Sequence, residues 1–223
     1  MGKTIELVAT DGQRFGAWLA EPPGAARGAV VVIQEIFGVN RHIRSVAEGY
    51  AADGYRALAP ALFDRVQRGY ETGYSAPEIE AGRALMQKLD WSQTMLDVGA
   101  AIAEAAKAGR VGIVGYCFGG TVAWVAAARL AGLACAVAYY GGGIPDFIGE
   151  KPRCPTMCHF GELDQSPSLE QARAIARAHP EILAHFYPGA GHGFNCDLRP
   201  SWNAEAAKLA RARTLEFFRR HVG

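Results

Sequence analysis

The stretch that most constrains the fold of this chain runs from Val111 to Ala127 and reads "VGIVGYCFGGTVAWVAA". An apolar run typical of a strand passes directly into an alanine-rich run typical of a helix, with Cys117 at the junction. Gly115 and Gly119 stand two residues before and after that cysteine. Glycines at these places let the backbone turn sharply and approach its neighbours closely. Cys117 is therefore either a nucleophile on a tight turn or a cysteine that packs by chance at a strand end.

The surroundings of Cys117 favour the nucleophile. The junction matches the G-x-S-x-G nucleophile elbow, with Cys in place of Ser. The helix that follows directs the positive end of its dipole at the sulfur, which stabilises a thiolate. A free cysteine is more often a small buried hydrophobe, but a packing role does not require glycines on both sides. We predict that Cys117 is a nucleophile.

Short apolar runs alternate with helical stretches along the chain, which indicates an α/β fold. Strands are expected over 5–8, 15–19, 29–33, 55–63, 110–116, 134–142, 155–161 and 181–189. Helices are expected over 42–52, 76–88, 92–108, 119–131, 168–178 and 202–221, and a loop over 64–75. The last helix places Ala206, Leu209, Leu215 and Phe218 near one face. Because such alternation produces right-handed crossovers, we predict one domain over 1–223 with the α/β-hydrolase fold: a mostly parallel sheet of about eight strands flanked by helices.

A cysteine nucleophile needs a base and a group that orients the base. In open parallel sheets, chemistry sits where strands end. Asp164 follows the expected strand 155–161, and His192 lies in the glycine-rich loop "GAGHGF" after the last strand. The order Cys117, Asp164, His192 is the order of an α/β-hydrolase triad. Taken alone, Asp164 could be a solvated loop acid or a helix cap, and Glu162 is a nearby alternative for the acid of the triad. Taken alone, His192 could be an ordinary loop histidine.

Composition and charge restrict the classes of molecule that the chain is expected to bind. The formal net charge of +1 includes no concentrated basic block, which argues against nucleic acid and acidic membranes. The N-terminal sequence shows no secretory signal, and no apolar span is long enough to cross a membrane. Five cysteines without framework spacing fit a reducing compartment. We expect a cytoplasmic monomer or homodimer that acts on a small molecule.

No cofactor or metal is expected. The sequence has no phosphate-binding loop, no dinucleotide glycine pattern and no H-E-x-x-H motif. The other histidines are interpreted as structural: His42, His159, His179, His185 and His221. The other cysteines are interpreted as packing or loop thiols, since the C-x₃-C pair has no second half: Cys135, Cys154, Cys158 and Cys196.

Five motifs together resemble the dienelactone hydrolase family, also called carboxymethylenebutenolidases. They are "QEIFGVN", "GYCFGG", "AYYGGG", "GELD" and "GAGHGF", and the resemblance runs from about position 4 to 221. It implies a cysteine hydrolase with a triad at Cys117, His192 and Asp164. It also implies that Glu35 lies beside the nucleophile, contacts the neutral thiol at rest and helps to form the thiolate; the alternative is a carboxylate solvated at the sheet edge.

The same resemblance implies an oxyanion hole. Its donors would be the backbone N–H groups of Phe118, directly after the nucleophile, and of Ile36, in the loop after the strand 29–33. Such donors stabilise the negative oxygen of a tetrahedral intermediate.

The sequence departs from the family at the residues that bind the carboxylate of the substrate. Members that process the lactone hold its carboxylate with two arginines, one of them four residues after the catalytic histidine, where this chain has Cys196. Arg199 is the nearest arginine there, and Arg83 lies one turn from the other expected place. Either arginine could substitute or lie solvated at the surface. Tyr140 could line the pocket or pack in the core.

These observations predict a cysteine-dependent hydrolase of a carboxylic ester or enol-lactone, with an acyl-enzyme on Cys117. The resemblance implies conversion of carboxymethylenebutenolide to a maleylacetate-type product. An esterase or thioesterase for a neutral small molecule, a redox-responsive thiol protein and a catalytically silent scaffold are the alternatives.

Overall fold

The computed structural model describes residues 2–223, and Met1, the first residue of the predicted domain, lies outside this part. The strands are β1 (Lys3–Val8), β2 (Arg14–Ala20), β3 (Ala29–Ile33), β4 (Arg56–Pro60), β5 (Val111–Tyr116), β6 (Leu133–Tyr139), β7 (Thr156–Gly161) and β8 (Leu183–Tyr187). The α-helices are α1 (Arg41–Ala52), α2 (Ala76–Met86), α3 (Trp91–Ala105), α4 (Phe118–Arg129), α5 (Leu169–Ala178) and α6 (Ala204–His221). Short 3₁₀ turns occur at Leu62–Arg65, Ala106–Ala108 and Ile144–Phe147.

Within residues 2–223 the strands form one eight-stranded sheet in the order β1-β2-β4-β3-β5-β6-β7-β8. The opening hairpin is antiparallel, and β2 also pairs antiparallel with β4. The strands from β4 and β3 onward to β8 pair in parallel. This sheet confirms the predicted α/β-hydrolase architecture.

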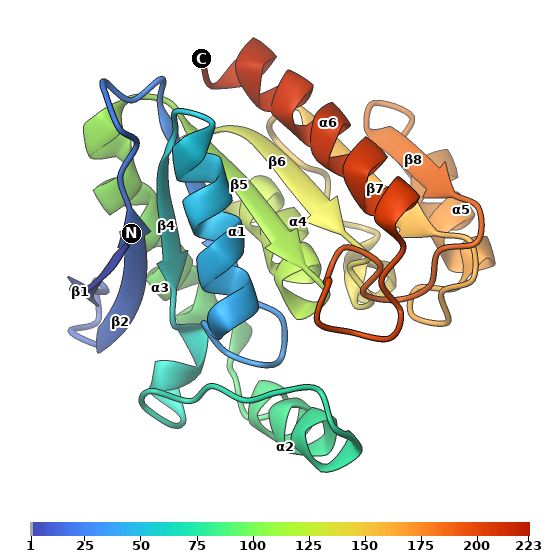
Figure 1. Ribbon diagram of the computed structural model, residues 1–223, viewed down its shortest axis with the longest axis horizontal. Helices are drawn as coiled ribbons and strands as arrows, with labels where there is room; N and C mark the ends of the chain where they lie inside the picture. Colours follow the sequence, from blue (N-terminus) through green and yellow to red (C-terminus); the bar gives the residue numbers. More distant parts are fainter. Residues whose placement is uncertain (1) are drawn as a thin grey trace.

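Helices cover both faces of the sheet (Figure 1). Helices α1 and α6 pack on one face, where their buried side chains include Ile43, Tyr50 and Phe218. Helices α3, α4 and α5 pack on the other face, which holds Val98 and Trp124 among its core residues. The middle strands β3 and β5 are buried along their whole length, as their continuous apolar sequences predict.

The ends of the central strands bring the chemical groups together. Ile33 at the end of β3 pairs with Gly115 near the end of β5, and Gly161 at the end of β7 pairs with Tyr187 at the end of β8. The loops that follow these strands therefore leave the sheet at one edge. Helix α2 lies beyond this edge, set apart from the two layers that flank the sheet (Figure 1).

Several predicted strand ends and one predicted helix face are wrong, and two of these differences have a clear physical cause. The expected strand 55–63 ends at Pro60, because Leu62 begins a 3₁₀ turn and donates its backbone N–H to the Gln34 side chain over 3.2 Å. In α6, Leu209 is 46% exposed and does not share the buried face. The buried residues of α6 recur mostly at intervals of four, and they are Ala206, Ala210, Thr214, Phe217 and Phe218.

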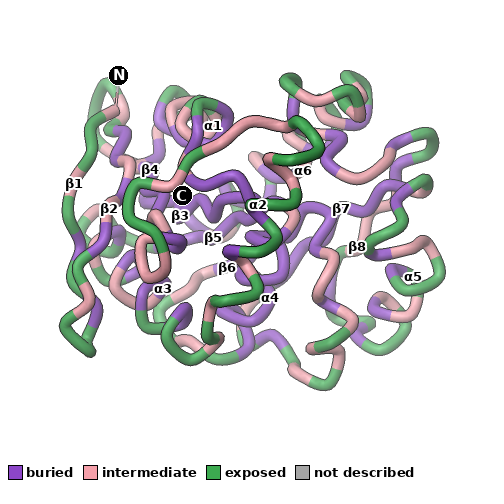
Figure 2. Tube along the Cα trace, turned by 90° about the horizontal axis from the view of Figure 1, so that it is seen from below, coloured by how far each residue is buried: buried purple, intermediate pink, exposed green. Residues whose placement is uncertain are grey.

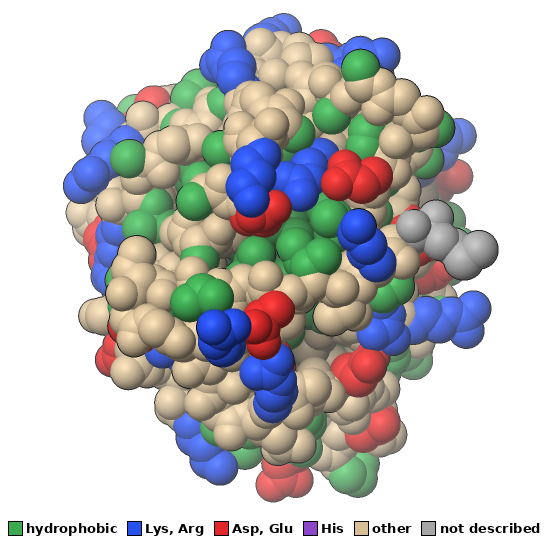
Figure 3. Space-filling model, turned by 90° about the vertical axis from the view of Figure 1, so that its left-hand side faces the viewer, with side chains coloured by type: hydrophobic (Ala, Val, Ile, Leu, Met, Phe, Trp, Pro, Cys, Tyr) green, Lys and Arg blue, Asp and Glu red, His purple; other side chains and the backbone are tan. Residues whose placement is uncertain are grey.

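The edge of the sheet at β1 is open to solvent (Figure 2). Acidic and basic side chains lie next to one another on this side of the molecule (Figure 3). Arg14 and Arg68 both form ion pairs with Glu6, and Arg65 lies between Asp11 and Asp97. No helix described within residues 2–223 is both long enough and apolar enough to cross a bilayer.

Candidate active site

The junction between β5 and α4 is a strained turn centred on Cys117. This residue has φ 56° and ψ −116°, outside the regions that non-glycine residues normally adopt. Strain of this kind costs about 1–3 kcal/mol and occurs at functional sites. A Cβ on Gly115 would lie 1.8 Å from the Gly119 carbonyl oxygen, and one on Gly119 would lie 2.4 Å from that of Ile33. Both glycines are therefore required by the close backbone contacts, as the sequence predicts.

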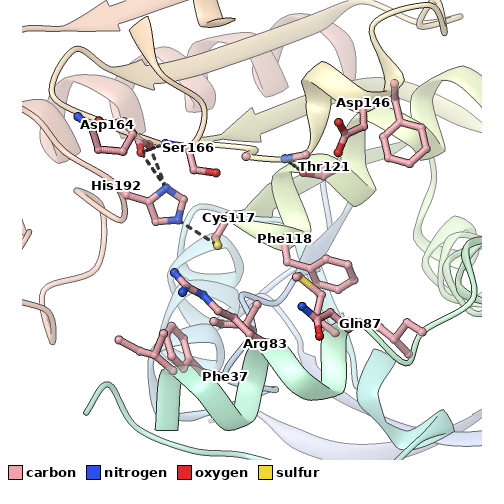
Figure 4. A pocket seen from close by; sticks show the side chains of 18 of the residues that line it. Phe37, Arg83, Gln87, Cys117, Phe118, Thr121, Asp146, Asp164, Ser166 and His192 are labelled. Atoms are coloured by element: carbon pink, nitrogen blue, oxygen red, sulfur yellow. Dashed lines mark hydrogen bonds and ion pairs between the residues drawn. The ribbon is translucent and has the colours of Figure 1, made fainter. Parts of the chain in front are cut away.

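The structure brings the three predicted triad residues together (Figure 4). His192 Nε2 lies 3.0 Å from Cys117 Sγ, and His192 Nδ1 lies 2.9 Å from Asp164 Oδ2. Asp164 is almost wholly buried, whereas the His192 side chain is partly exposed. The imidazole thus bridges the sulfur and the carboxylate, which is the geometry of a base held in position by an acid.

Asp164, rather than Glu162, is the acid that reaches the histidine. The backbone N–H of Ser166 donates to Asp164 Oδ1 over 2.8 Å, which leaves Oδ2 for the shorter contact with His192. Among residues 2–223, Glu162 makes no hydrogen bond to His192. The short turn after β7 thus determines which of the two neighbouring acids contacts His192.

The surroundings of His192 favour its protonated form. Burial lowers the pKa of His192, but the interactions with Cys117 and Asp164 outweigh burial and raise that pKa well above 6.5. The imidazole therefore lies in a position and an electrostatic environment suited to proton transfer.

A cavity of about 750 Å³ opens in front of Cys117. Its aromatic wall contains Trp91, Phe118 and Phe147, with ring centroids 6.1 Å apart for Trp91–Phe118 and 4.7 Å apart for Trp91–Phe147. Its basic side contains Arg199 and, from α2, Arg83, which Figure 4 shows across the cavity from the triad. The cavity therefore offers an apolar wall and two cationic groups around one nucleophile.

The predicted oxyanion donors border the same cavity. Ile36 and Phe118 both line it, and Phe118 is the first residue of α4. Its N–H therefore belongs to the helix N-terminus, where N–H groups have no acceptor within the helix. The Ile36 N–H donates no backbone hydrogen bond within residues 2–223. Gly82 of α2 packs on this loop so closely that a Cβ there would lie 2.3 Å from the Ile36 carbonyl oxygen.

Glu35 is 1% exposed and pairs with Arg199, whose Nη1 lies 3.2 Å from Glu35 Oε1. The alternative of a solvated strand-end carboxylate is thereby wrong, as is that of a solvated Arg199. Within residues 2–223, Glu35 makes no hydrogen bond to Cys117. The thiol is bonded to His192 instead.

Two aromatic rings hold Arg199 in the cavity. Its guanidinium carbon lies 5.5 Å from the Phe37 ring centroid and 5.9 Å from that of Tyr74, a cation–π arrangement. Neither aromatic residue is predicted from the sequence as part of the site. Tyr74 lies in the loop without a clear period, and Phe37 follows Ile36 directly, which was the available signal for it.

Tyr140 is wholly buried and is not among the residues that line the cavity. Its ring centroid lies 5.2 Å from that of His192, so it supports the histidine from behind, as the core-packing alternative states. Burial raises the pKa of Tyr140 well above 10. Among the remaining histidines, His159 is buried and its ring nitrogens lie within hydrogen-bond distance of Tyr187 and Thr214. His42 lies with Glu35 and Cys196 in a buried group of potential metal ligands.

The chain is similar to known proteins along nearly its whole length. The sequence matches the Dienelactone hydrolase family over residues 15–222. Carboxymethylenebutenolidase 1 of Cupriavidus pinatubonensis is 36% identical over 225 residues, which cover 95% of this chain and 94% of that protein. A Synechocystis protein provisionally given the same enzyme name is 36% identical, with 96% and 95% of the two chains covered.

A solved structure supports the same assignment. The crystal structure of a Klebsiella pneumoniae protein, provisionally called a dienelactone hydrolase, has a TM-score of 0.83 and 29% identity, with 98% of this chain and 99% of that chain covered. The family match and the two relatives span nearly the whole sequence. The chain belongs to the dienelactone hydrolase family and is a hydrolase of that family.

Proposed function

We propose that this hydrolase cleaves carboxylic esters and enol-lactones through a covalent acyl-enzyme on Cys117. The observation that carries the proposal is the 3.0 Å contact between His192 Nε2 and Cys117 Sγ at the wall of a substrate-sized cavity. Nucleophile and base at this separation form an activated pair. The family names of the relatives point to the same reaction class.

Acylation begins when the Cys117 thiolate attacks the ester carbonyl carbon. The carbonyl oxygen becomes negative and accepts hydrogen bonds from the N–H groups of Phe118 and Ile36, which border the cavity. Collapse of this intermediate expels the alkoxide or enolate, which takes a proton from His192. The enolate of an enol-lactone is a good leaving group, so a thiolate can displace it without a strong base.

Deacylation uses the same groups in the reverse order. Neutral His192, oriented by the 2.9 Å contact to Asp164, takes a proton from water. The hydroxide attacks the thioester, and Cys117 leaves as a thiolate.

The thiolate that begins acylation forms when substrate binds. In our proposal Glu35, which lies against Arg199 at rest, accepts the thiol proton of Cys117 when a substrate carboxylate draws Arg199 away.

The two arginines favour a substrate that carries a carboxylate. Arg199 and Arg83 line the cavity although neither occupies the position of the family's arginines, and Cys196 stands at one of these. A guanidinium binds a carboxylate in two parallel hydrogen bonds. Carboxymethylenebutenolide, converted to a maleylacetate-type product, meets this requirement. The apolar wall of Trp91, Phe118 and Phe147 favours a neutral aromatic ester as the second candidate.

Steady-state hydrolysis of cis-dienelactone beside neutral p-nitrophenyl esters tests the proposal, with Cys117→Ala as the blank. We expect Cys117-dependent turnover of both, with a higher kcat/KM for the lactone. Turnover of neutral esters alone would retain the cysteine mechanism and reject the carboxylate-bearing substrate. Wild-type rates in Cys117→Ala would reject the mechanism itself.

A further inference from the structure

Three buried side chains with metal-binding chemistry meet beside the active site. Glu35 follows β3, His42 lies in the first turn of α1, and Cys196 lies in the loop after His192. One carboxylate oxygen, one ring nitrogen and the sulfur all lie within 4.8 Å of one another. The three residues are 1%, 5% and 0% exposed. Carboxylate, imidazole and thiolate are the ligands of protein-bound Zn²⁺.

Two of these side chains have a buried polar atom without a partner. Within residues 2–223, neither Glu35 Oε2 nor His42 Nε2 makes a hydrogen bond. Buried polar atoms are normally paired, because an unpaired one destabilises the folded state. Two such atoms in one cluster point to a bound group that satisfies both.

The other polar atom of each side chain already has a neighbour. Arg199 donates to Glu35 Oε1 over 3.2 Å, and Asp197 Oδ1 lies 3.6 Å from His42 Nδ1. A carboxylate beside Nδ1 favours the proton on that nitrogen, which leaves the Nε2 lone pair for a metal. The cluster thus carries both its ligand atoms and a carboxylate that orients the histidine.

We propose that Glu35, His42 and Cys196 form a binding site for one thiophilic divalent cation of the Zn²⁺ class. Zinc bonds of about 2.0–2.3 Å in a tetrahedron place ligand atoms about 3–4 Å apart, so small side-chain rotations close the 4.8 Å cluster. Cys196 binds as a thiolate and releases its proton to solvent, while water takes the fourth position. Arg199 remains on Oε1, and its positive charge weakens the affinity for the cation.

The site has a consequence for catalysis, which rests on the proposed function. A Glu35 carboxylate bound to a cation cannot accept the Cys117 proton, so occupation inhibits the enzyme. His42 does not line the cavity, so its substitution should leave basal turnover unchanged.

Cobalt(II) titration of the Cys117→Ser protein tests the site without relying on activity, since that variant lacks the thiol that contacts His192. We expect one equivalent of Co²⁺ and a near-ultraviolet thiolate-to-cobalt band. Cys196→Ser should abolish the band, His42→Gln should weaken binding at least about tenfold, and Cys154→Ser, which removes a half-buried thiol elsewhere, should retain both. Absence of the band in the Cys117→Ser protein would overturn the site. It would also be overturned if Cys196→Ser retained the band and His42→Gln bound Co²⁺ with undiminished affinity.

Zinc inhibition of the wild-type enzyme then tests the consequence. One equivalent of Zn²⁺ should lower ester turnover, and His42→Gln should resist this inhibition. Cobalt binding without zinc inhibition would reject the role of Glu35 in the proposed function while retaining the site. Zinc inhibition that is equal in His42→Gln would reject this site as its cause.

Discussion

The guanidinium of Arg199 donates to Glu35 Oε1 over 3.2 Å and joins the loop after the catalytic histidine to the end of β3. The same guanidinium lies against Phe37 and Tyr74 and lines the cavity. Arg199 is therefore placed both to bind a substrate carboxylate and to release Glu35 when it does so. This double role makes Arg199 the residue that relates substrate charge to thiolate formation in our account.

Substitution of Arg199 should separate substrates by charge. We expect Arg199→Gln to lower kcat/KM for cis-dienelactone by about 10- to 100-fold, since a charged hydrogen bond contributes about 1.5–3 kcal/mol. Turnover of p-nitrophenyl acetate should change less than about threefold. Arg173→Gln, on the outer α5, is the control and should affect neither substrate. Equal losses for both substrates would show that Arg199 does not recognise the carboxylate.

Two helical glycines provide a matched test of how α2 docks. Gly82→Ala would place a Cβ 2.3 Å from the Ile36 carbonyl oxygen, whereas Gly99→Ala in α3 meets no atom within 4 Å. We expect Gly82→Ala to destabilise the fold by about 1–3 kcal/mol and to reduce kcat about tenfold or more by displacing an oxyanion donor. Gly99→Ala should stabilise by about 0.5–1 kcal/mol with unchanged kcat. Denaturant unfolding and ester kinetics give both values; unchanged kcat in folded Gly82→Ala would contradict the role of Ile36.

The raised pKa of His192 predicts a pH dependence of stability. Folding raises that pKa well above 6.5, so the folded state binds a proton that the unfolded state releases. The stabilisation is fully present below about pH 6.5 and is lost as pH rises through the folded-state pKa. We therefore expect the difference in unfolding free energy between wild type and His192→Gln to decrease from pH 6 to pH 9. A difference that grows over this range would give His192 a lowered pKa instead.

The aromatic wall should determine the preferred size of neutral esters. Trp91 lines the cavity, while Trp202 is 49% exposed and lies outside it. We expect Trp91→Ala to lower the kcat/KM ratio of p-nitrophenyl benzoate to acetate by about 10-fold, in the range of 1–3 kcal/mol for a lost apolar contact. Trp202→Ala should leave the ratio unchanged. An unchanged ratio in Trp91→Ala would exclude this wall from substrate selection.

Much of this site follows from local sequence patterns. Cys117 and its flanking glycines lie within one five-residue segment. Asp164 and His192 each follow a recognisable strand, so the geometry of a parallel sheet brings these two residues to the same edge as Cys117. Arg199 could not be assigned in this way. Its position depends on an irregular loop and on Tyr74, a partner from a segment without periodicity.

The same reason explains the metal-ligand cluster and the error in α6. His42 and Cys196 are separated by most of the chain, so no ligand spacing in the sequence relates them. In α6, the packing against the sheet selects Ala210 and Thr214 over the more apolar Leu209, because helix orientation is fixed by the whole core.

The most direct test of the account is mass spectrometry of the enzyme quenched during turnover of a p-nitrophenyl ester. We predict an added acyl mass on the peptide that contains Cys117, and no adduct in Cys117→Ala. In His192→Gln, which turns over slowly, the adduct should accumulate because the base that activates water is missing. Sustained hydrolysis by Cys117→Ala, or an acyl group on another residue, would contradict the cysteine mechanism.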